Sequence, residues 1–378
     1  MHNLFQLISN LPEYLLILLI LWLLSFLIQL FYYLFFYSRI IFKDKNKHDI
    51  RDEPVSVIIC AQNEEENLKK HLPRILTQYY PNYEVIVVDD CSTDNTEEVL
   101  KDFAKKYPNL RYTSIKKDEK FNHNKKLAIF VGILAANNEI LVFTDADCYP
   151  FSQNWLKNIV CHFKKGIDAV ISYGKYEKQK GILNKLIRYD TYFIGLQYLT
   201  FALSGIPYMG VGRNMSYLKS VFFKNKGFYS FCTLKSGDDD LFINKISKRK
   251  NIAVCTNYES FTVSIPRKSF IKWLYQKKRH YSTFKFYKLK HKILLFIEPL
   301  SRFFFYFSFI PIVIQIENQE LMYVLLILFS LRTLITLIIH FIGTRKLKEK
   351  DLFVWFILFD IFFIFVWLLP VLFIKNRK

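Results

Sequence analysis

Several features are scarce in this sequence, and each absence narrows what the protein can be. The six cysteines form no Cys-x-x-Cys pair and several lie in apolar runs, which predicts reduced thiols in the cytosol. Basic residues outnumber acidic residues, and the net charge is +20. The lysines nevertheless form no basic arm, and no aromatic platform lines a basic groove. We therefore expect no nucleic acid partner. Attraction to anionic membrane lipids explains the charge more simply.

Charged residues are nearly absent from four long stretches. The sequence is 52% hydrophobic and 18% aromatic, which is unusually apolar for a soluble protein. Each stretch is long enough to cross a hydrocarbon core of roughly 30 Å as a helix. A polytopic transporter would carry more charged residues in such spans, so it stays an alternative, as does a basic membrane-surface binding protein without catalysis. The stretches are residues 15–37, 293–316, 321–342 and 352–374, and their charged residues include Glu298, Arg302, Arg332 and Asp360.

The first stretch has no basic residue before it and no small-residue cleavage site after it, which predicts a signal anchor over residues 1–38. Basic residues follow it directly, so the next part of the chain is expected in the cytoplasm. Three spans near the C-terminus would place the last basic residues on the opposite side, against the charge rule. Either stronger signals override that rule, or the segment with Glu298 and Arg302 lies along the membrane surface. The basic residues concerned are Arg39, Lys43, Lys45 and Lys47 at the first stretch and Lys375, Arg377 and Lys378 at the end.

Between the apolar stretches, short β-branched runs alternate with helical patterns. This alternation predicts an α/β fold with a mainly parallel sheet covered by helices on both faces. Ligands bind such a sheet at the carboxyl ends of its strands. Polar side chains follow three of the expected strands at that edge, namely Asn63, Asp89 with Asp90, and Asp145 with Asp147. The expected strands are residues 55–60, 83–88, 110–115 and 140–143, and the expected helices include residues 63–78 and 125–136.

Asp145 and Asp147 follow a buried strand and are separated by one alanine. Alternate residues of an extended chain point the same way, so both carboxylates can face one crevice. Such oxygen ligands suit Mg²⁺ or Mn²⁺, which would also hold the phosphates of a nucleotide. Taken alone, the pair also fits a polar turn after a strand.

The second half of the soluble region is less regular. Residues 169–176 predict a strand, and Gly210 and Gly212 allow the backbone to approach a ligand. The carboxylates of residues 238–240 precede a helical pattern. They fit a charged helix start, or a cluster in which repulsion raises one pKa enough to make a base. Residues 269–285 mix aromatic residues with lysines and predict an interfacial helix, within a segment of residues 266–292.

Taken in order, these motifs resemble the inverting family 2 glycosyltransferases, specifically the membrane-integrated branch of cellulose, hyaluronan and chitin synthases. The resemblance covers residues 55–281 and implies the GT-A fold. Residues 57–65 are similar to the family's first strand and its nucleotide-contacting Asn-Glu, and residues 89–94 to its Asp-Asp-x-Ser-x-Asp. Residues 125–128 fall where the family has Gly-Lys-x-x-Ala, with Asn124 replacing glycine.

The resemblance also implies roles and boundaries. Asp239 would be the catalytic base, and Asp145 and Asp147 would hold Mg²⁺ or Mn²⁺. A catalytic domain would occupy residues 39–265 and a C-terminal transmembrane region residues 293–378. The implied donor-binding residues are Asn63, Glu64, Asp89, Asp90, Lys125, Asp145 and Arg279, and the implied acceptor-side residues are Gly212, Asp238, Gln276 and His280.

The last motif departs from the pattern, since residues 276–280 read Gln-Lys-Lys-Arg-His where membrane synthases have Gln-x-x-Arg-Trp. We interpret His280 as a stacking or hydrogen-bonding substitute for the tryptophan, because no second histidine stands at helical spacing to share a metal. The change disfavours processive polymerisation but leaves single-sugar transfer untouched.

The expected function is inverting transfer from a nucleotide-diphosphate sugar to a hydroxyl of a lipid-linked or oligosaccharide acceptor, by metal-assisted single displacement. The reaction would take place at the cytoplasmic face of the cell (inner or plasma) membrane, with membrane lipids as partners. A processive polysaccharide synthase is the alternative. Self-association as a homo-oligomer is left open, as are the sugar, the nucleotide and the acceptor.

Overall fold

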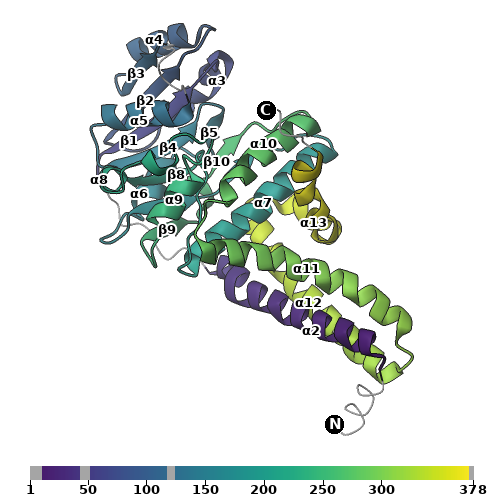
Figure 1. Cartoon of the computed structure of the whole chain (residues 1–378). Coiled ribbons are helices and arrows are strands. Elements are labelled where there is room, and N and C mark those ends of the chain that lie inside the picture. The colour runs from purple at the N-terminus through teal and green to yellow at the C-terminus, as the bar shows by residue number, and fades with distance from the viewer. Residues whose placement is uncertain (1–10, 43–51, 117–123, 374–378) are drawn as a thin grey trace. The chain divides into compact units, whose positions relative to one another are not determined.

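The computed structural model describes residues 11–42, 52–116 and 124–373, and the chain divides into two compact units (Figure 1). The larger unit contains residues 43–287 and 346–348. The other contains residues 1–42, 288–345 and 349–378. Most of the basic residues that flank the predicted spans lie outside the described residues: Lys43, Lys45, Lys47, Lys375, Arg377 and Lys378.

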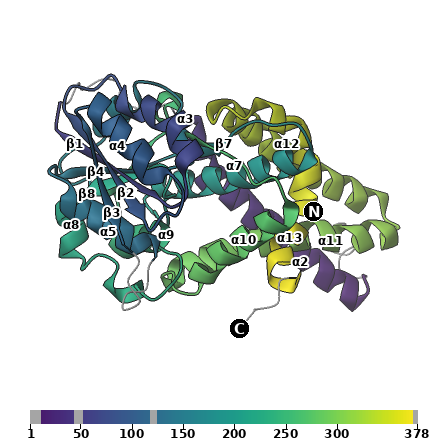
Figure 2. The ribbon, with the colours of Figure 1, turned by 90° about the horizontal axis from the view of Figure 1, so that it is seen from above.

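A seven-stranded sheet in the order β3-β2-β1-β4-β8-β6-β9 forms the centre of the larger unit. The neighbouring strands β3, β2, β1 and β4 run parallel to one another. Figure 2 gives a view of this unit from above. β8 runs antiparallel to both β4 and β6, and β9 runs parallel to β6. The predicted mainly parallel sheet is therefore confirmed. The strands are β1 (Val55–Ala61), β2 (Tyr83–Asp90), β3 (Leu110–Ile115), β4 (Ile140–Asp145), β6 (Ala169–Ser172), β8 (Met215–Leu218) and β9 (Ile252–Cys255).

Helices with one apolar face cover this sheet. In α3, Leu68, Leu72 and Ile75 recur at helical spacing and are buried against the strands. In α4, acidic residues occupy the first turn and lysines the last, which complements the helix dipole. The helices of this unit are α3 (Glu65–Leu76), α4 (Thr96–Lys106), α5 (Lys125–Ala135), α6 (Trp155–Val160), α7 (Ile182–Leu203), α8 (Lys219–Lys224), α9 (Asp240–Ile246) and α10 (Phe270–Phe284).

A small sheet of three strands accompanies the large one, in the order β5 (Cys148–Pro150), β10 (Thr262–Ser264) and β7 (Gly174–Tyr176). The single strand predicted over residues 169–176 is in fact two, because the chain leaves β6 at Tyr173 and enters the small sheet as β7. The carbonyl of Tyr173 accepts a hydrogen bond from Asn214 Nδ2 (2.9 Å). This side-chain bond marks the change from one sheet to the other.

The other unit is helical, and α2 (Glu13–Phe31), α11 (Leu289–Gln315) and α12 (Gln319–Lys346) lie side by side in it (Figure 1). Trp22 of α2 stacks on Phe305 and Phe309 of α11. Within the described part of the chain, three helices are long and apolar enough to cross a membrane: residues Glu13–Ile41, Leu289–Gln315 and Gln319–Lys346. The third predicted C-terminal span falls on η5 (Lys350–Trp355) and α13 (Phe356–Phe373), which are not among these three.

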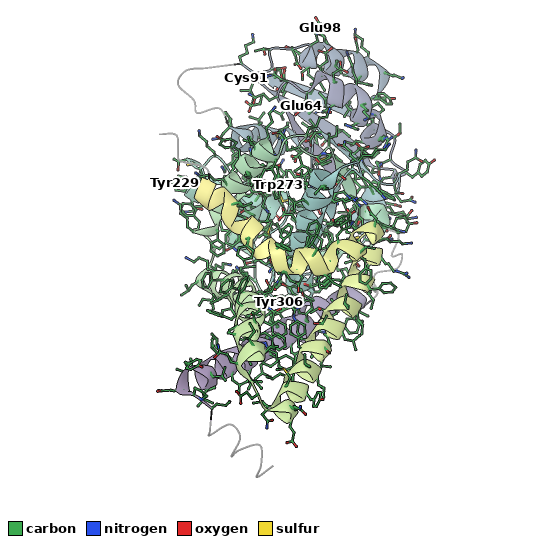
Figure 3. The ribbon with its side chains drawn as sticks, turned by 90° about the vertical axis from the view of Figure 1, so that its right-hand side faces the viewer. Glu64, Cys91, Glu98, Tyr229, Trp273 and Tyr306 are labelled. Atoms are coloured by element: carbon green, nitrogen blue, oxygen red, sulfur yellow. The ribbon has the colours of Figure 1, made fainter. Side chains whose placement is uncertain are left out.

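The four charged residues noted in the apolar stretches, Glu298, Arg302, Arg332 and Asp360, are buried and paired with one another. Arg332 Nη1 lies 2.8 Å from Asp360 Oδ2, and Arg302 pairs with both Glu298 and Asp360. Tyr306, labelled in Figure 3, donates its hydroxyl to Asp360 Oδ2 (2.5 Å). Glu298 and Arg302 therefore do not mark α11 as a surface helix, since both side chains are buried in ion pairs.

Candidate functional site

The tips of β1 and β2 are joined by a set of hydrogen bonds at the carboxyl edge of the sheet. Asn63 and Cys91, the residues that turn the chain, adopt φ values of 56° and 58°. Asn63 donates its backbone N–H to Ser92 Oγ (2.9 Å), and its Oδ1 accepts from the N–H of Thr93 (2.8 Å). Figure 3 shows Glu64 and Cys91, which follow these tips, at the same end of the sheet.

The predicted aspartates lie at this edge in register. Asp89 stands beside Ala61, and Asp145 stands beside Cys60 on the other side of β1. Two strand spacings therefore separate the two aspartates, about 10 Å. Burial raises the pKa of the Glu64 carboxyl, and the negative charges of Asp147 and Asp145 raise it further. Glu64 thus faces the same acidic region.

Lys125 links two of the predicted motifs. Its Nζ lies 2.5 Å from Asp145 Oδ1 and 3.5 Å from Asp238 Oδ2. Burial alone would raise the pKa of Asp145, but the charge and hydrogen bond of Lys125 outweigh it and leave that pKa lowered. Asn124, which replaces the family's glycine, caps α5 by accepting from the N–H groups of Lys126 (3.0 Å) and Leu127 (3.2 Å).

Asp145, Asp147 and Cys148 each offer a ligand atom, and these atoms lie within 4.8 Å of one another. Burial and the neighbouring charge of Asp145 raise the pKa of Asp147. Burial raises the pKa of the Cys148 thiol well above its ordinary value, so this thiol is a poor ligand at neutral pH. Two crowded carboxylates remain, which suit a hard divalent cation such as Mg²⁺ or Mn²⁺.

Asp239 is held by two backbone N–H groups. Its Oδ1 accepts from Asp240 at the start of α9, and its Oδ2 accepts from Gly212, both at 2.8 Å. A Cβ at Gly212 would lie 3.4 Å from Asp239 Oδ2 and 3.5 Å from Lys125 Nζ. The structure therefore brings together Gly212, Lys125, Asp238 and Asp239. Asp239 therefore caps α9 and also lies beside the acidic residues at the carboxyl edge of the sheet.

Asp240, the third carboxylate of the run, has different partners. Its Oδ2 accepts hydrogen bonds from Thr283 Oγ1 (2.5 Å) and from the Tyr287 hydroxyl (2.8 Å). Burial, followed by the charge of Asp239, raises the pKa of Asp240 to about 7. This side chain joins α9 to the end of α10.

The predicted last motif lies on α10. Gln276 donates from Nε2 to the hydroxyl of Tyr176 (3.2 Å) in the small sheet. Arg279 is exposed, and burial raises the pKa of Asp145, but Lys125, then Arg213 and then the charge of Arg279 lower it. His280 is also exposed, and within the described residues its side chain makes no hydrogen bond with the other predicted site residues.

Sequence reasoning missed Arg213, which directly follows Gly212. Its Nε donates to the carbonyl of Gly174 (3.0 Å), and its guanidinium carbon lies 4.6 Å from the centre of the Tyr176 ring. The sequence did contain a signal for this residue, since Arg213 directly follows the pair of glycines, but only the glycines were interpreted. The partners on the small sheet could not be foreseen because they are far away in the sequence.

Comparison with known proteins finds a family that matches part of the larger unit. Residues 56–223 match Glycosyl transferase family 2. Glycosyltransferase AglE of Haloferax volcanii is 40% identical over 119 residues, which cover 31% of this chain and 38% of that protein. The dolichyl N-acetyl-alpha-D-glucosaminyl phosphate 3-beta-D-2,3-diacetamido-2,3-dideoxy-beta-D-glucuronosyltransferase of Methanococcus voltae is 30% identical over 193 residues, covering 48% of this chain and 53% of that one. The chain spans about half or less of the length of these relatives.

Among solved structures, mannosyltransferase PcManGT from Pyrobaculum calidifontis, in complex with GDP-Man and Mn²⁺, is similar with a TM-score of 0.55. The match covers 91% of this chain and 98% of that one at 19% sequence identity, so it bears on the fold alone. The family match extends from β1 to α8 of the larger unit. Residues 56–223 therefore match a family 2 glycosyltransferase domain, and the fold of the chain is the GT-A fold.

Proposed function

We propose that the protein is an inverting glycosyltransferase that moves a sugar from a nucleotide-diphosphate sugar to a hydroxyl group of a lipid-linked or oligosaccharide acceptor. The observation that carries this proposal is the Asp239 carboxylate, held by Gly212 beside the Lys125–Asp145 ion pair. A base and an acidic metal motif are thus close together. The Methanococcus voltae relative, whose name specifies a dolichyl-phosphate-linked sugar, supports a lipid-linked acceptor.

Asp239 would take the proton from the acceptor hydroxyl during attack on the anomeric carbon. The two N–H groups that hold its oxygens orient the carboxylate and leave lone pairs for the incoming proton. Such general-base action is commonly worth about a hundred- to ten-thousandfold in rate. A single displacement inverts the anomeric configuration. Asp238, the neighbouring carboxylate, lies 3.5 Å from Lys125 and is not required as a nucleophile.

Asp145 and Asp147 would hold Mg²⁺ or Mn²⁺, whose chemistry is to neutralise the diphosphate leaving group. Mn²⁺ in the mannosyltransferase structure supports this choice. The exposed Arg279 would add positive charge for the leaving group. We assign the remaining donor contacts to Asn63, Glu64, Asp89, Asp90 and Lys125, and the acceptor side to Gly212, Asp238, Gln276 and His280.

We further propose that residues 39–265 form the catalytic domain, residues 266–292 an interfacial segment, and residues 1–38 and 293–378 the membrane region. Three helices that are long and apolar enough to cross a membrane support this arrangement. The catalytic domain would face the cytoplasm, at the cell (inner or plasma) membrane, because nucleotide sugars are cytosolic. A reporter fused near Lys116 that is active only outside the cytoplasm would overturn this orientation.

The test is to incubate membranes containing the protein with a panel of nucleotide sugars and acceptors, with and without Mn²⁺. We expect nucleotide release and labelled product from at least one donor, dependent on the metal. Membranes with Asp239→Asn serve as the control for other enzymes. Release that is equal with this variant would exclude the proposed base. A processive polysaccharide synthase is the second candidate, favoured by Arg279 within the Gln-x-x-Arg motif, and product size distinguishes the two.

A further inference from the structure

Arg213 is held rigidly although no motif assigns it a role. Its carbonyl accepts a hydrogen bond from Thr262 Oγ1 (2.9 Å) of β10. The next residue, Asn214, is fully buried, accepts from Trp155 Nε1 (3.1 Å) and donates to Ser260 O (2.8 Å). The backbone that carries Arg213 is therefore fixed on both sides.

Gly174 and Tyr176 of the small sheet hold the guanidinium group and form its seat. This group bonds the Gly174 carbonyl and lies over the ring of Tyr176, a geometry that stabilises a cation. A Cβ at Gly174 would come within 2.6 to 2.9 Å of three atoms of the arginine side chain, so glycine makes room for it. Within the described residues, its two terminal nitrogens make no hydrogen bond, so these donors remain for a ligand.

The register of the small sheet brings this seat close to the metal motif. Tyr176 pairs with Ser264, and Ser264 pairs with Cys148, the neighbour of Asp147. Two strand spacings amount to about 10 Å. Ser264 Oγ also donates to Asp147 Oδ1 (3.4 Å).

The formal charges of the site explain why a further cation is needed. Five carboxylates, on Glu64, Asp145, Asp147, Asp238 and Asp239, lie in this region together with the cations of Lys125 and Arg279. A divalent metal would still leave this set with one negative charge. A diphosphate carries at least two negative charges and gains another as it leaves, so it requires a site with net positive charge. Arginine also offers paired donors that match two phosphate oxygens, which lysine lacks.

We propose that Arg213 binds a phosphate group, supplied by the diphosphate of the donor or by a phosphorylated lipid acceptor, with Gly174 and Tyr176 as the seat of its guanidinium. This inference rests on the proposed function and adds a binding residue to its site. Gln276 strengthens the seat, because it bonds the hydroxyl of the same tyrosine (3.2 Å).

The first arm of the test measures GDP and UDP binding by calorimetry with Mn²⁺, using the purified full chain. We expect Arg213→Met to weaken binding about tenfold or more, consistent with loss of a charged hydrogen bond. Gly174→Ala keeps the charge but displaces the guanidinium, so it should give the same result. The control is Arg111→Met, which removes an arginine paired with Glu84 near the opposite ends of the strands. Melting temperatures establish that each variant is folded.

The second arm measures the acceptor KM with phosphorylated and unphosphorylated lipid acceptors. Unchanged nucleotide binding with a KM raised about tenfold for the phosphorylated acceptor alone would assign the phosphate to the acceptor. A folded Arg213→Met protein that changes neither quantity would overturn the inference. If the unmodified protein itself binds neither nucleotide and transfers no sugar, the proposed function fails and the inference fails with it.

Discussion

Lys125 Nζ lies 2.5 Å from Asp145 Oδ1, so an ammonium group of the protein itself already contacts one oxygen of the proposed metal motif. Asp147 differs, since the contacts of its carboxylate are with Cys148 Sγ (3.2 Å) and Ser264 Oγ (3.4 Å). A divalent cation that reaches Asp145 must therefore share or displace the lysine, whereas Asp147 can bind it directly. The two aspartates are not equivalent.

Replacing Lys125 by methionine should strengthen binding of Mn²⁺ alone, because the competing cation is removed from Asp145. Charges at such short range shift equilibria by about tenfold or more. Titration with Mn²⁺ in the absence of nucleotide measures the change. Lys126→Met is the matched control, since its Nζ bonds the Leu234 carbonyl instead (2.5 Å). Weaker metal binding in Lys125→Met would contradict this view of the lysine.

Asp147→Asn keeps the shape of the side chain but removes its charge. We expect donor binding in the presence of Mn²⁺ to weaken about tenfold or more, while binding without metal changes little. Calorimetry with and without Mn²⁺ separates the two effects. Equal donor affinity of the variant and the unmodified protein under both conditions would count against the metal motif.

Asp239→Asn should lower turnover by about a hundred- to ten-thousandfold while leaving donor affinity within a few-fold. The amide can still accept a hydrogen bond from Gly212 with its oxygen, so the cap of α9 is only partly lost. Single-turnover rates and donor calorimetry on the same preparation provide the comparison. A variant that retains most of its turnover would exclude Asp239 as the base.

Asp240 should make stability depend on pH. Its pKa is raised to about 7, so its stabilising contribution is complete below the pKa of the unfolded chain, near 4, and is lost as the pH rises through about 7. Asp240→Asn stays neutral. The melting temperature of this variant relative to the unmodified protein should therefore increase between about pH 5 and about pH 8. Parallel melting curves for the two proteins across this range would refute the prediction.

His280→Trp restores the aromatic residue of the membrane synthases. An aromatic face over a sugar ring holds it and lets it slide, and the smaller histidine holds it less firmly. We therefore expect the unmodified protein to add one or a few sugars, and the variant to give longer products. Labelled product is sized with acceptor in excess over enzyme. Long chains from the unmodified protein, formed while most acceptor is unused, would disprove this. Trp273 is buried on α10, whereas Tyr281 is half-buried, so the ring of Tyr281 is the more accessible substitute.

The parts of the fold that were predictable are those with local signals. The β-branched runs before Asp89 and Asp145 predicted the strands, and the sheet edge followed because parallel strands end together. The helix expected at residues 269–285 is present as α10, although Trp273, Leu274 and Lys277 on it are buried. Its location at a membrane interface stays a prediction.

Contacts between residues that are far apart in the sequence could not be predicted. The chain leaves β6 at Tyr173, whose carbonyl accepts hydrogen bonds from Asn214 Nδ2 and from the N–H of Thr262, and no residue near 173 in the sequence indicates these partners. Arg213 gains its position only when β7 and β10 meet. The lysine beside Asp145 was assigned to the donor from the resemblance, but its ion pair with the metal motif depends on how α5 packs against the sheet.

The buried charges of the helical unit have a consequence for how the protein is made. Gln29 of α2 accepts a hydrogen bond from Arg332 of α12 (2.7 Å), and Arg332 and Arg302 share Asp360 of α13. An arginine facing lipid without its partner costs several kcal/mol. If these helices insert in sequence order, α11 and α12 bring their arginines before the shared carboxylate has been synthesised. Synthesis that stops before α13 would leave these two arginines with the carboxylate of Glu298 but without that of Asp360.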